Sequence, residues 1–260
     1  MYEKELQAMI EAAYASDAWI MEVYRRGFEV EIKSDDSPVT EADKGADAII
    51  RKILGEKFPD YGFLTEETPD NDDRLSKEYI WIVDPVDGTK EFVSHRGEFA
   101  TCIALCRNHE IVAGVINLPA QNVLFYATKN GGAWRLPRYG EAKQIHVNDK
   151  TEQITVLRSV SFFNEEEKRI IENHKDKIGL IFARGAAQKY CMVAEGLAES
   201  FIRGHGQTKE WDLAAGDILI KEAGGIITDP FGKNLVYNKK DVYFHDGYRF
   251  ANRIENLFIK

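Results

Sequence analysis

Apolar and polar residues recur along the chain with two different periods, which predict helices in some segments and strands in others. Residues 3–26 carry apolar side chains at helical spacing with charged residues between them, so we expect a long amphipathic helix there. A short strand over residues 30–32 is predicted next. Thr40, with Asp43 three residues later, is close to a capping box and predicts the start of a second helix, which Pro59 and the turn after it end.

Between residues 60 and 145 the pattern predicts mostly strands. Residues 80–83 are continuously apolar, as in a strand that is covered on both faces. Pairs of apolar runs separated by short polar turns follow, and Asn130-Gly131 is a strong hairpin signal. We therefore expect two antiparallel hairpins, formed by residues 99–106 with 111–117 and by residues 123–128 with 133–136. The polar segment 69–77 predicts a mobile loop.

Beyond residue 145, predicted strands alternate with predicted helices. The strands fall at residues 154–158, 178–183, 200–203 and 226–228, and the helices at residues 165–174, 188–197 and 212–223. This alternation is typical of an α/β arrangement, and with the hairpins before it the chain is predicted to be mixed α+β. A chain of 260 residues can bury a substantial core. Because no repeat or linker interrupts it, we expect two closely packed halves, residues 1–145 and 146–260.

Composition narrows the classes of protein that fit. The hydrophobic and charged fractions, 44% and 30%, are those of a soluble globular protein, and no apolar run is long enough to span a membrane. The first residues lack the apolar core of a signal peptide, so a cytoplasmic location is expected. A net charge of −9 disfavours nucleic-acid polymers and anionic membranes as partners. It still allows a small phosphorylated substrate, since bound metal ions can invert the local field.

Neither cysteine nor histidine predicts a metal or disulfide framework. The three cysteines form no C-x-x-C pair, and reduced thiols in the core are the better interpretation. The six histidines show no H-x-x-x-H spacing and are interpreted as scattered structural or surface residues.

The segment after the buried strand, D-P-V-D-G-T, carries the most specific chemistry. Asp84 is expected at the carboxyl end of that strand, and Asp87 follows closely enough for both carboxylates to converge. Gly88 lets a ligand approach the backbone, and a helix starting at Thr89 would turn free N–H groups toward an anion. Two hard oxygen ligands beside such a turn predict a site for Mg²⁺ and a phosphate ester. The alternative is an ordinary surface turn built from Asp, Pro and Gly.

Two other acidic positions could complete this site. Glu66 follows a short apolar run and could supply a third carboxylate from a second strand end, or lie in a solvated loop. Asp212 falls at the start of a helix, where it could be only a cap. The small residues 214–216 would nevertheless let that helix approach another element closely and set Asp212 against the other two aspartates.

These motifs together resemble the lithium-sensitive, Mg²⁺-dependent phosphatases related to inositol monophosphatase. Four segments match in that family's order and approximate spacing over nearly the whole chain: SPVTEAD (37–43), TEE (65–67), WIVDPVDGT (81–89) and EWDLAAGD (210–217). DGTKEF, GEFATCIAL (97–105), GVINLP (114–119) and KYCMVAEGLAESFIR (189–203) are most similar to the 3'(2'),5'-bisphosphate nucleotidase branch. The resemblance implies a layered αβαβα fold with the active site between the two halves.

The resemblance also implies a role for each candidate residue. The metal ligands would be Glu66, Asp84, Asp87, Asp212 and the carbonyl of Val86, holding two to three Mg²⁺ ions. Asp43 and Thr89 would orient the attacking water, with Glu66 contributing to catalysis as a metal ligand. Substrate would be held by Asp87, Gly88, Thr89, Lys189 and Arg203.

The implied reaction is hydrolysis of the 3'-phosphate of 3'-phosphoadenosine 5'-phosphate by metal-activated water. Lys189 and Arg203 would lie near the 5'-phosphate, although both could be merely solvated charges. Two departures affect this leaving-group side: Ala186-Ala187 stands where the branch has two serines, and Val160 stands where it often has histidine.

Two alternatives remain open. One is the same chemistry on inositol monophosphate or a sugar bisphosphate. The other is an inactive protein that binds metal and phosphate, which the presence of Asp43 and Thr89 argues against, because binding alone needs neither. The sequence predicts no oligomeric state.

Overall fold

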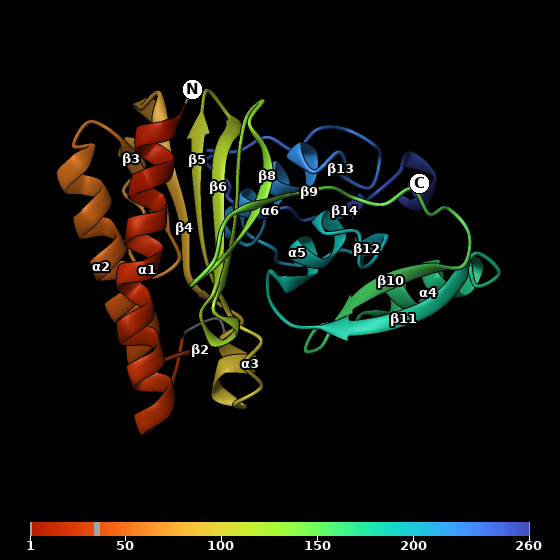
Figure 1. Cartoon of the computed structure of the whole chain (residues 1–260), viewed down its shortest axis with the longest axis horizontal. Helices are drawn as coiled ribbons and strands as arrows, with labels where there is room; N and C mark the ends of the chain where they lie inside the picture. The colour runs from red at the N-terminus through yellow and green to blue at the C-terminus, as the bar shows by residue number, and fades with distance from the viewer. Residues whose placement is uncertain (1, 34–36, 260) are drawn as a thin grey trace.

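The computed structural model describes residues 2–33 and 37–259, and it has five layers (Figure 1). Helices α1 (Glu3–Arg26) and α2 (Glu41–Lys57) cover one face of a seven-stranded sheet. Helices α5 (Gln188–Ala194) and α6 (Glu210–Glu222) lie between that sheet and a five-stranded one, and α4 (Glu165–Asn173) lies beyond it. This is the predicted αβαβα layering. No helix within the described residues is long and apolar enough to cross a membrane.

The seven-stranded sheet contains both predicted hairpins. Its strands follow chain order, and only the β3–β4 pair is parallel. They are β3 (Gly62–Thr65), β4 (Tyr79–Asp87), β5 (Ala100–Arg107), β6 (Glu110–Leu118), β7 (Val123–Thr128), β8 (Gly132–Pro137) and β9 (Lys143–Ile145). The short edge strand β9 was not predicted, because its three residues carry too little pattern.

Strand β4, which lies between β3 and β5, is longer than predicted. We expected the strand to end at Asp84, but it continues to Asp87, with a shift of register against β5 between Asp84 and Asp87. The carboxylate of Asp84 accepts a hydrogen bond from the Val86 N–H, 3.1 Å, and Thr101 donates its hydroxyl proton to the Pro85 carbonyl, 3.0 Å. These contacts hold the irregular segment in the sheet. The strand pattern therefore persists through a proline, as it can at a bulge.

Chain reversal after β4 depends on one glycine. Gly88 has φ of +90°, a conformation that residues with a Cβ rarely adopt, and helix α3 (Thr89–Val93) begins directly after it. The predicted strand–turn–helix unit is thus confirmed, although the helix has only five residues.

The five-stranded sheet has the order β11-β10-β12-β14-β13. Strand β10 pairs in parallel with β11 and β12, whereas β14 is antiparallel to both of its neighbours. Its strands are β10 (Ile154–Ser159), β11 (Ile178–Arg184), β12 (Ser200–Arg203), β13 (Ile226–Thr228) and β14 (Tyr248–Ala251). Strand β14 was not predicted. The remaining short elements are β1 (Glu31–Ile32), β2 (Pro38–Val39), η2 (Pro119–Gln121) and η3 (Ile254–Asn256).

The polar segment predicted as a mobile loop is instead anchored. It contains the 3₁₀ helix η1 (Asp73–Ser76), and the Arg74 side chain is buried at 2% exposure. Its guanidinium donates to the carboxylate of Asp70, to the side-chain oxygen of Asn238 at 2.6 Å and to the carbonyl of Lys239. An arginine in a polar run gives no sequence signal for burial, because its partners lie far away in the chain.

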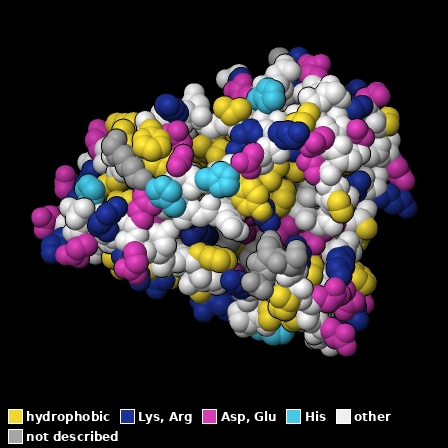
Figure 2. All heavy atoms as spheres, turned by 180° about the vertical axis from the view of Figure 1, so that it is seen from behind, with side chains coloured by type: hydrophobic (Ala, Val, Ile, Leu, Met, Phe, Trp, Pro, Cys, Tyr) yellow, Lys and Arg dark blue, Asp and Glu magenta, His cyan; other side chains and the backbone are white. Residues whose placement is uncertain are grey.

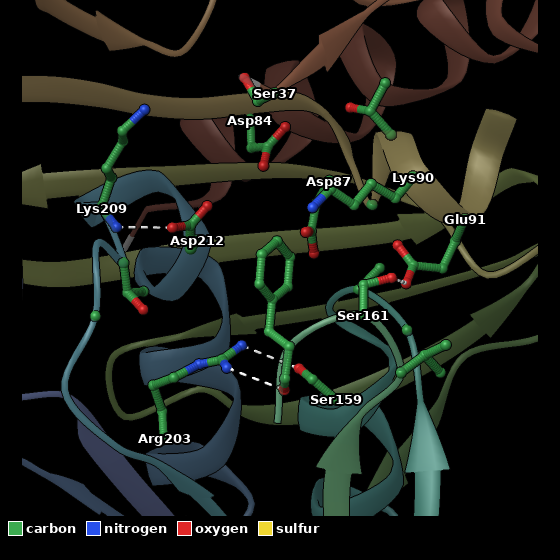
Figure 3. Close-up of a pocket in the computed structure, with 18 of the residues that line it drawn as sticks. Ser37, Asp84, Asp87, Lys90, Glu91, Ser159, Ser161, Arg203, Lys209 and Asp212 are labelled. Carbon is green, nitrogen blue, oxygen red and sulfur yellow. Dashed lines mark hydrogen bonds between the residues drawn. The ribbon is translucent and has the colours of Figure 1, made fainter. Parts of the chain in front are cut away.

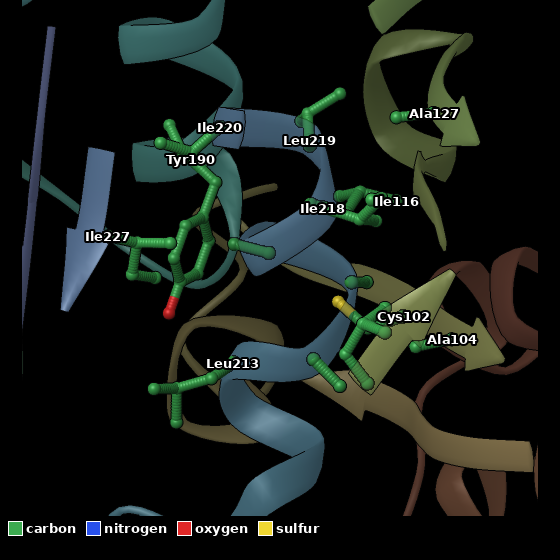
Figure 4. Packing of buried hydrophobic residues seen from close by; sticks show 14 of the residues in the cluster. Cys102, Ala104, Ile116, Ala127, Tyr190, Leu213, Ile218, Leu219, Ile220 and Ile227 are labelled. Atoms are coloured by element: carbon green, nitrogen blue, oxygen red, sulfur yellow. The ribbon is translucent and has the colours of Figure 1, made fainter. Parts of the chain in front are cut away.

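Helix α6 packs unusually close to its neighbours, as its small residues predicted. A Cβ at Gly114 of β6 would lie 2.5 Å from Ile218, and a Cβ at Gly216 would overlap the Tyr190 ring (Figure 4). The surrounding cluster joins buried residues of both sheets, and it also contains the buried thiols Cys102, Cys106 and Cys191. Because one core serves both sheets, the division near residue 145 stays a prediction.

We predict that Gly216→Ala lowers the thermal unfolding midpoint, whereas Gly55→Ala in α2 raises it. Alanine favours helix by about 1 kcal/mol at either position. At Gly216 the added methyl meets the buried ring of Tyr190, and such overpacking costs about 1–3 kcal/mol. At Gly55 the nearest atom outside the helix is 3.9 Å away, in Phe63. Equal gains in midpoint, measured by thermal denaturation, would contradict the close packing.

Candidate active site

The predicted site residues gather around one cavity of about 700 Å³ between the two sheets. On the face shown in Figure 2 the surface is hollowed near its centre, with charged side chains of both signs around the hollow. Nine of the ten predicted residues line this cavity: Glu66, Asp84, Val86, Asp87, Gly88, Thr89, Lys189, Arg203 and Asp212. The tenth, Asp43, lies directly behind Thr89.

Secondary structure brings the carboxylates together from three separate parts of the chain. Asp84 and Asp87 lie on either side of the register shift in β4. Glu66 directly follows the parallel neighbour β3, and its N–H donates to the Val83 carbonyl, 3.2 Å. Asp212 lies in the first turn of α6, where its carboxylate accepts the Lys209 N–H at 2.7 Å. In Figure 3, Asp84, Asp87 and Asp212 face the same space.

Burial and mutual repulsion disfavour the ionised forms of these carboxyls. Burial is the main cause that raises the pKa of Asp84 well above its usual range, and Glu66, Asp87 and Asp212 add to the shift. Burial likewise raises the pKa of Asp87 to about 6, against the lowering effect of Lys189. The pKa of Asp212 rises to about 7, through burial and then through Glu66 and Asp87. The charged site therefore needs cations.

One cation is supplied by the chain itself, at Glu66. The Lys33 ammonium lies 3.2 Å from a carboxylate oxygen of Glu66 and 2.5 Å from one of Glu67. Burial alone would lower the pKa of Lys33, but the two carboxylates outweigh burial and raise it. Burial also raises the pKa of Glu67 to about 7, although Lys33 opposes this. Lys33 thus neutralises one acidic edge of the cavity, a contact that sequence analysis missed.

The chemical type of the carboxylates fits a magnesium site, although these side chains do not surround a common centre. Within residues 2–33 and 37–259, no three His, Cys, Asp or Glu side chains form a ready group for a metal ion. The donors are nevertheless all hard oxygens, and the electrostatic coupling of Asp84 to Glu66, Asp87 and Asp212 is the repulsion that a divalent cation relieves. A bound ion would have to draw these side chains closer.

Asp43 and Thr89 form a connected pair at the edge of the cavity. The Thr89 hydroxyl donates to Asp43 at 3.0 Å and lies 3.2 Å from the Val86 carbonyl. The second oxygen of Asp43 accepts both the N–H and the hydroxyl of Thr40, at 2.8 and 2.6 Å, which completes the predicted capping box. Burial raises the pKa of Asp43, and the Thr40 and Thr89 hydrogen bonds oppose this. The helix cap therefore fixes which oxygen faces Thr89.

The two basic residues assigned to the leaving-group side are both engaged with the protein. The Lys189 ammonium donates to the Ala186 carbonyl at 2.5 Å, and burial lowers its pKa to about 8, with Asp87 opposing. The Arg203 guanidinium contacts Glu167 at 3.3 Å. Its buried Nε–H finds no acceptor among the residues that the structure describes. Arg203 also donates to the Ser159 hydroxyl at 3.0 Å. Each residue lines the cavity, and their contact with a substrate phosphate stays a prediction.

Several cavity residues were not predicted as site residues from the sequence. Lys90, Ser161, Phe162 and Lys209 line the cavity, and Lys90 directly follows the D-P-V-D-G-T turn. Their local patterns are those of ordinary surface positions. They are distinguished from other surface residues only in the folded chain, where the segment after β10, helix α3 and the segment before α6 line one cavity.

A family model and several known proteins match the chain over almost its whole length. The model of the inositol monophosphatase family matches residues 1–257. The chain belongs to the inositol monophosphatase family. The fold and the resemblance predicted from the motifs are thereby confirmed.

Within this family, the chain is similar to proteins named 3'(2'),5'-bisphosphate nucleotidase CysQ. It is 36% identical to the one from Salmonella typhimurium over 241 residues, which are 92% of this chain and 95% of the relative. It is also 36% identical to that from Escherichia coli strain K12, over 92% of this chain and 96% of the relative.

Solved structures of the inositol monophosphatase family agree with this fold. CysQ from Bacteroides thetaiotaomicron, described as a bacterial member of the family, superposes with a TM-score of 0.84 at 30% identity, covering 97% of this chain and 98% of that one. The extragenic suppressor protein suhB from Bartonella henselae has a TM-score of 0.83 at 28% identity, with 99% of each chain covered.

We predict that Asp84→Asn reverses its effect on stability when magnesium is added. Without metal, removing one of several buried like charges should raise the thermal midpoint, because asparagine keeps the oxygen that accepts the Val86 N–H. With excess Mg²⁺, the wild-type protein should gain more stability than the variant, since a ligand that binds only the folded state stabilises it.

The measurement is thermal denaturation in EDTA and in Mg²⁺, with Asp60→Asn as the control. Asp60 is exposed and lies outside the cavity lining, so its substitution should shift neither midpoint. An Asp84→Asn variant that responds to Mg²⁺ like the wild type would remove Asp84 from the ligand set.

Proposed function

We propose that this protein is a magnesium-dependent 3'(2'),5'-bisphosphate nucleotidase that hydrolyses the 3'-phosphate of 3'-phosphoadenosine 5'-phosphate. Membership of the inositol monophosphatase family and 36% identity to relatives named as this nucleotidase support the reaction class and the substrate. The observation that carries the proposal is the cluster of acidic groups in one cavity beside the Thr89–Asp43 pair.

The metal would be held by the carboxylates of Glu66, Asp84, Asp87 and Asp212 together with the carbonyl of Val86. When bound, two to three magnesium ions would neutralise phosphoryl oxygens and lower the pKa of water at the site. The remaining chemistry falls to side chains that the structure positions directly. This division of labour is usual for phosphoryl transfer, in which positioning and electrostatics supply most of the catalysis.

Asp43 and Thr89 have the geometry to direct a proton away from the attacking water. The Thr89 hydroxyl donates to Asp43, so one of its lone pairs can accept a proton from a water in the cavity. The raised pKa of Asp43 makes its carboxylate a better proton acceptor than an exposed aspartate. Because two Thr40 groups hold the other oxygen, the pair keeps its orientation during the reaction.

The substrate's transferred phosphate would lie beside Gly88 and Thr89, and its second phosphate toward Lys189 and Arg203. Both cations line the same cavity as the carboxylates. The two serines that the nucleotidase branch has here are Ala186 and Ala187, so side-chain hydroxyls at these positions are not available to a phosphate. A cytoplasmic setting, two halves divided near residue 145, and no nucleic-acid polymer as partner remain parts of this proposal.

A panel of phosphate esters tests the substrate assignment. With Mg²⁺ at neutral pH, we expect phosphate release from 3'-phosphoadenosine 5'-phosphate to be faster, by kcat/KM, than release from inositol 1-phosphate or fructose 1,6-bisphosphate.

Asp87→Asn should abolish release from every ester while keeping the fold, because asparagine matches aspartate in shape but lacks its charge. A faster rate on inositol 1-phosphate would change the substrate, and turnover by folded Asp87→Asn would contradict the metal scheme.

The proton-directing role predicts different outcomes for two substitutions of Thr89. Thr89→Val keeps the shape of the side chain but removes the hydroxyl that contacts Asp43, so kcat should fall by about 10²- to 10⁴-fold. Thr89→Ser keeps the hydroxyl and should retain most activity. Circular dichroism checks the fold of both variants. Equal kcat values for the two would show that the hydroxyl does not take part.

A further inference from the structure

Phe162 places a phenyl ring in the wall of the catalytic cavity. The side chain is 54% exposed and belongs to the segment that follows β10. It lines the same cavity as the carboxylates. Single exposed aromatic residues are common on protein surfaces and need no function. Phe231, for example, is 53% exposed and does not line the cavity. The position of Phe162, not its exposure, therefore distinguishes it.

The segment that carries this ring is tied down from two sides. From β12, Arg203 donates to the Phe162 carbonyl at 3.3 Å and to the Ser159 hydroxyl at 3.0 Å. From α3, the carboxylate of Glu91 accepts the Ser161 hydroxyl at 2.6 Å (Figure 3). Glu91 is buried and lies two residues after Thr89. The backbone that carries the ring is thus held beside α3 before any ligand arrives, and such pre-organisation reduces the entropy lost on binding.

Two cations already contact the ring. The Lys90 ammonium lies 4.2 Å from the ring centroid, and the Arg203 guanidinium carbon lies 5.7 Å from it. Lys90 is exposed and its side chain is flexible, so its contact can be exchanged for another. A cation at an exposed ring strengthens an association by a few-fold, whereas a stacked base strengthens binding by about tenfold or more. A base can therefore displace Lys90 from the ring.

We propose that Phe162 is a specificity-determining residue that stacks against the heteroaromatic base of a nucleotide substrate. This inference rests on the proposed nucleotidase function and deepens it. Inositol and sugar phosphates have no aromatic face, so they gain nothing from the ring. Phe162 would then favour nucleotides through binding, with no part in the chemistry at the phosphate.

The test isolates the base by comparing two competitive inhibitors. Adenosine 5'-monophosphate and ribose 5-phosphate share the ribose and the phosphate and differ by the base alone. Their inhibition constants are measured with Mg²⁺ on the wild type and on Phe162→Ala, Phe162→Tyr and Phe231→Ala, using as reporter the ester that the wild type hydrolyses fastest. Phe231→Ala is the matched control, since the two rings are almost equally exposed.

We expect the wild type to bind adenosine 5'-monophosphate about tenfold more tightly than ribose 5-phosphate. Phe162→Ala should bring the two inhibition constants to near equality, whereas Phe162→Tyr and Phe231→Ala should keep the difference. Thermal denaturation checks that the variants fold. We expect them to fold, because the Phe162 ring is exposed and its removal leaves no buried cavity. A wild type with equal constants, or a Phe162→Ala variant that keeps the tenfold difference, would overturn the stacking role.

These outcomes separate the inference from the function on which it rests. Suppose that the wild type hydrolyses inositol 1-phosphate fastest, while the difference between the two inhibition constants still depends on Phe162. The stacking role is then supported and the substrate assignment is wrong. If the nucleotide is the fastest ester and the difference does not depend on Phe162, the function stands and the stacking role fails.

Discussion

Repulsion between buried carboxylates is the constraint on which the rest of this structure depends. Asp84, Asp87 and Asp212 lie in one cavity with Glu66, and each of the three aspartates has its pKa raised by burial first and by neighbouring acids. Two unit charges 4 Å apart interact by about 4 kcal/mol at an effective dielectric constant of 20. Such a cluster lowers stability unless cations enter it. A fold that contains this cluster is therefore less stable without cations than one with neutral residues at the same positions.

The protein tolerates this cost because the surrounding elements are firmly fixed. Asp84 and Asp87 belong to β4, an interior strand of the seven-stranded sheet that pairs with β3 on one side and β5 on the other. Asp212 is delivered by α6, which approaches β6 so closely that Gly114 has no room for a side chain. The Tyr190 hydroxyl, packed against the same helix, donates to the Asp212 carbonyl at 3.1 Å and holds its first turn. The backbone segments that carry the three aspartates therefore cannot shift without disturbing the core that joins both sheets.

Much of the acidic side of the candidate site could be predicted from the sequence, because its signals are local. The capping box at Thr40 and Asp43, the strand before Asp84 and the turn at Gly88 each depend on neighbouring residues, and the structure contains all three. The family resemblance then joined these segments. The end of β4 was misjudged because Pro85 normally interrupts a strand, whereas here hydrogen bonds from Val86 and Thr101 hold the irregular segment in place.

Other features could not be predicted, because they depend on contacts between distant segments. The buried Arg74, which finds partners at Asn238 and Lys239, looked like part of a mobile polar loop. The pairing of Lys33 with Glu66 joins residues 33 positions apart, and neither residue's surroundings in the sequence suggest it. Strand β14 has only four residues and lies among turns. A short element of this kind is defined by the sheet that receives it.

The same distinction explains why the reaction is easier to infer than the substrate. The proposed magnesium ligands are oxygen donors, as this ion prefers. They come from segments that begin or end regular elements, where the sequence constrains side-chain direction. The opposite wall is formed by the segment after β10, α5 and the approach to α6, whose side chains face the cavity only through tertiary contacts. Arg203 is an example. Its guanidinium donates hydrogen bonds to the Ser159 hydroxyl and the Phe162 carbonyl, and it thereby fixes the position of the segment that lines the cavity. Substrate choice then follows from the surface that such residues hold in place, and that surface is visible only in the folded chain.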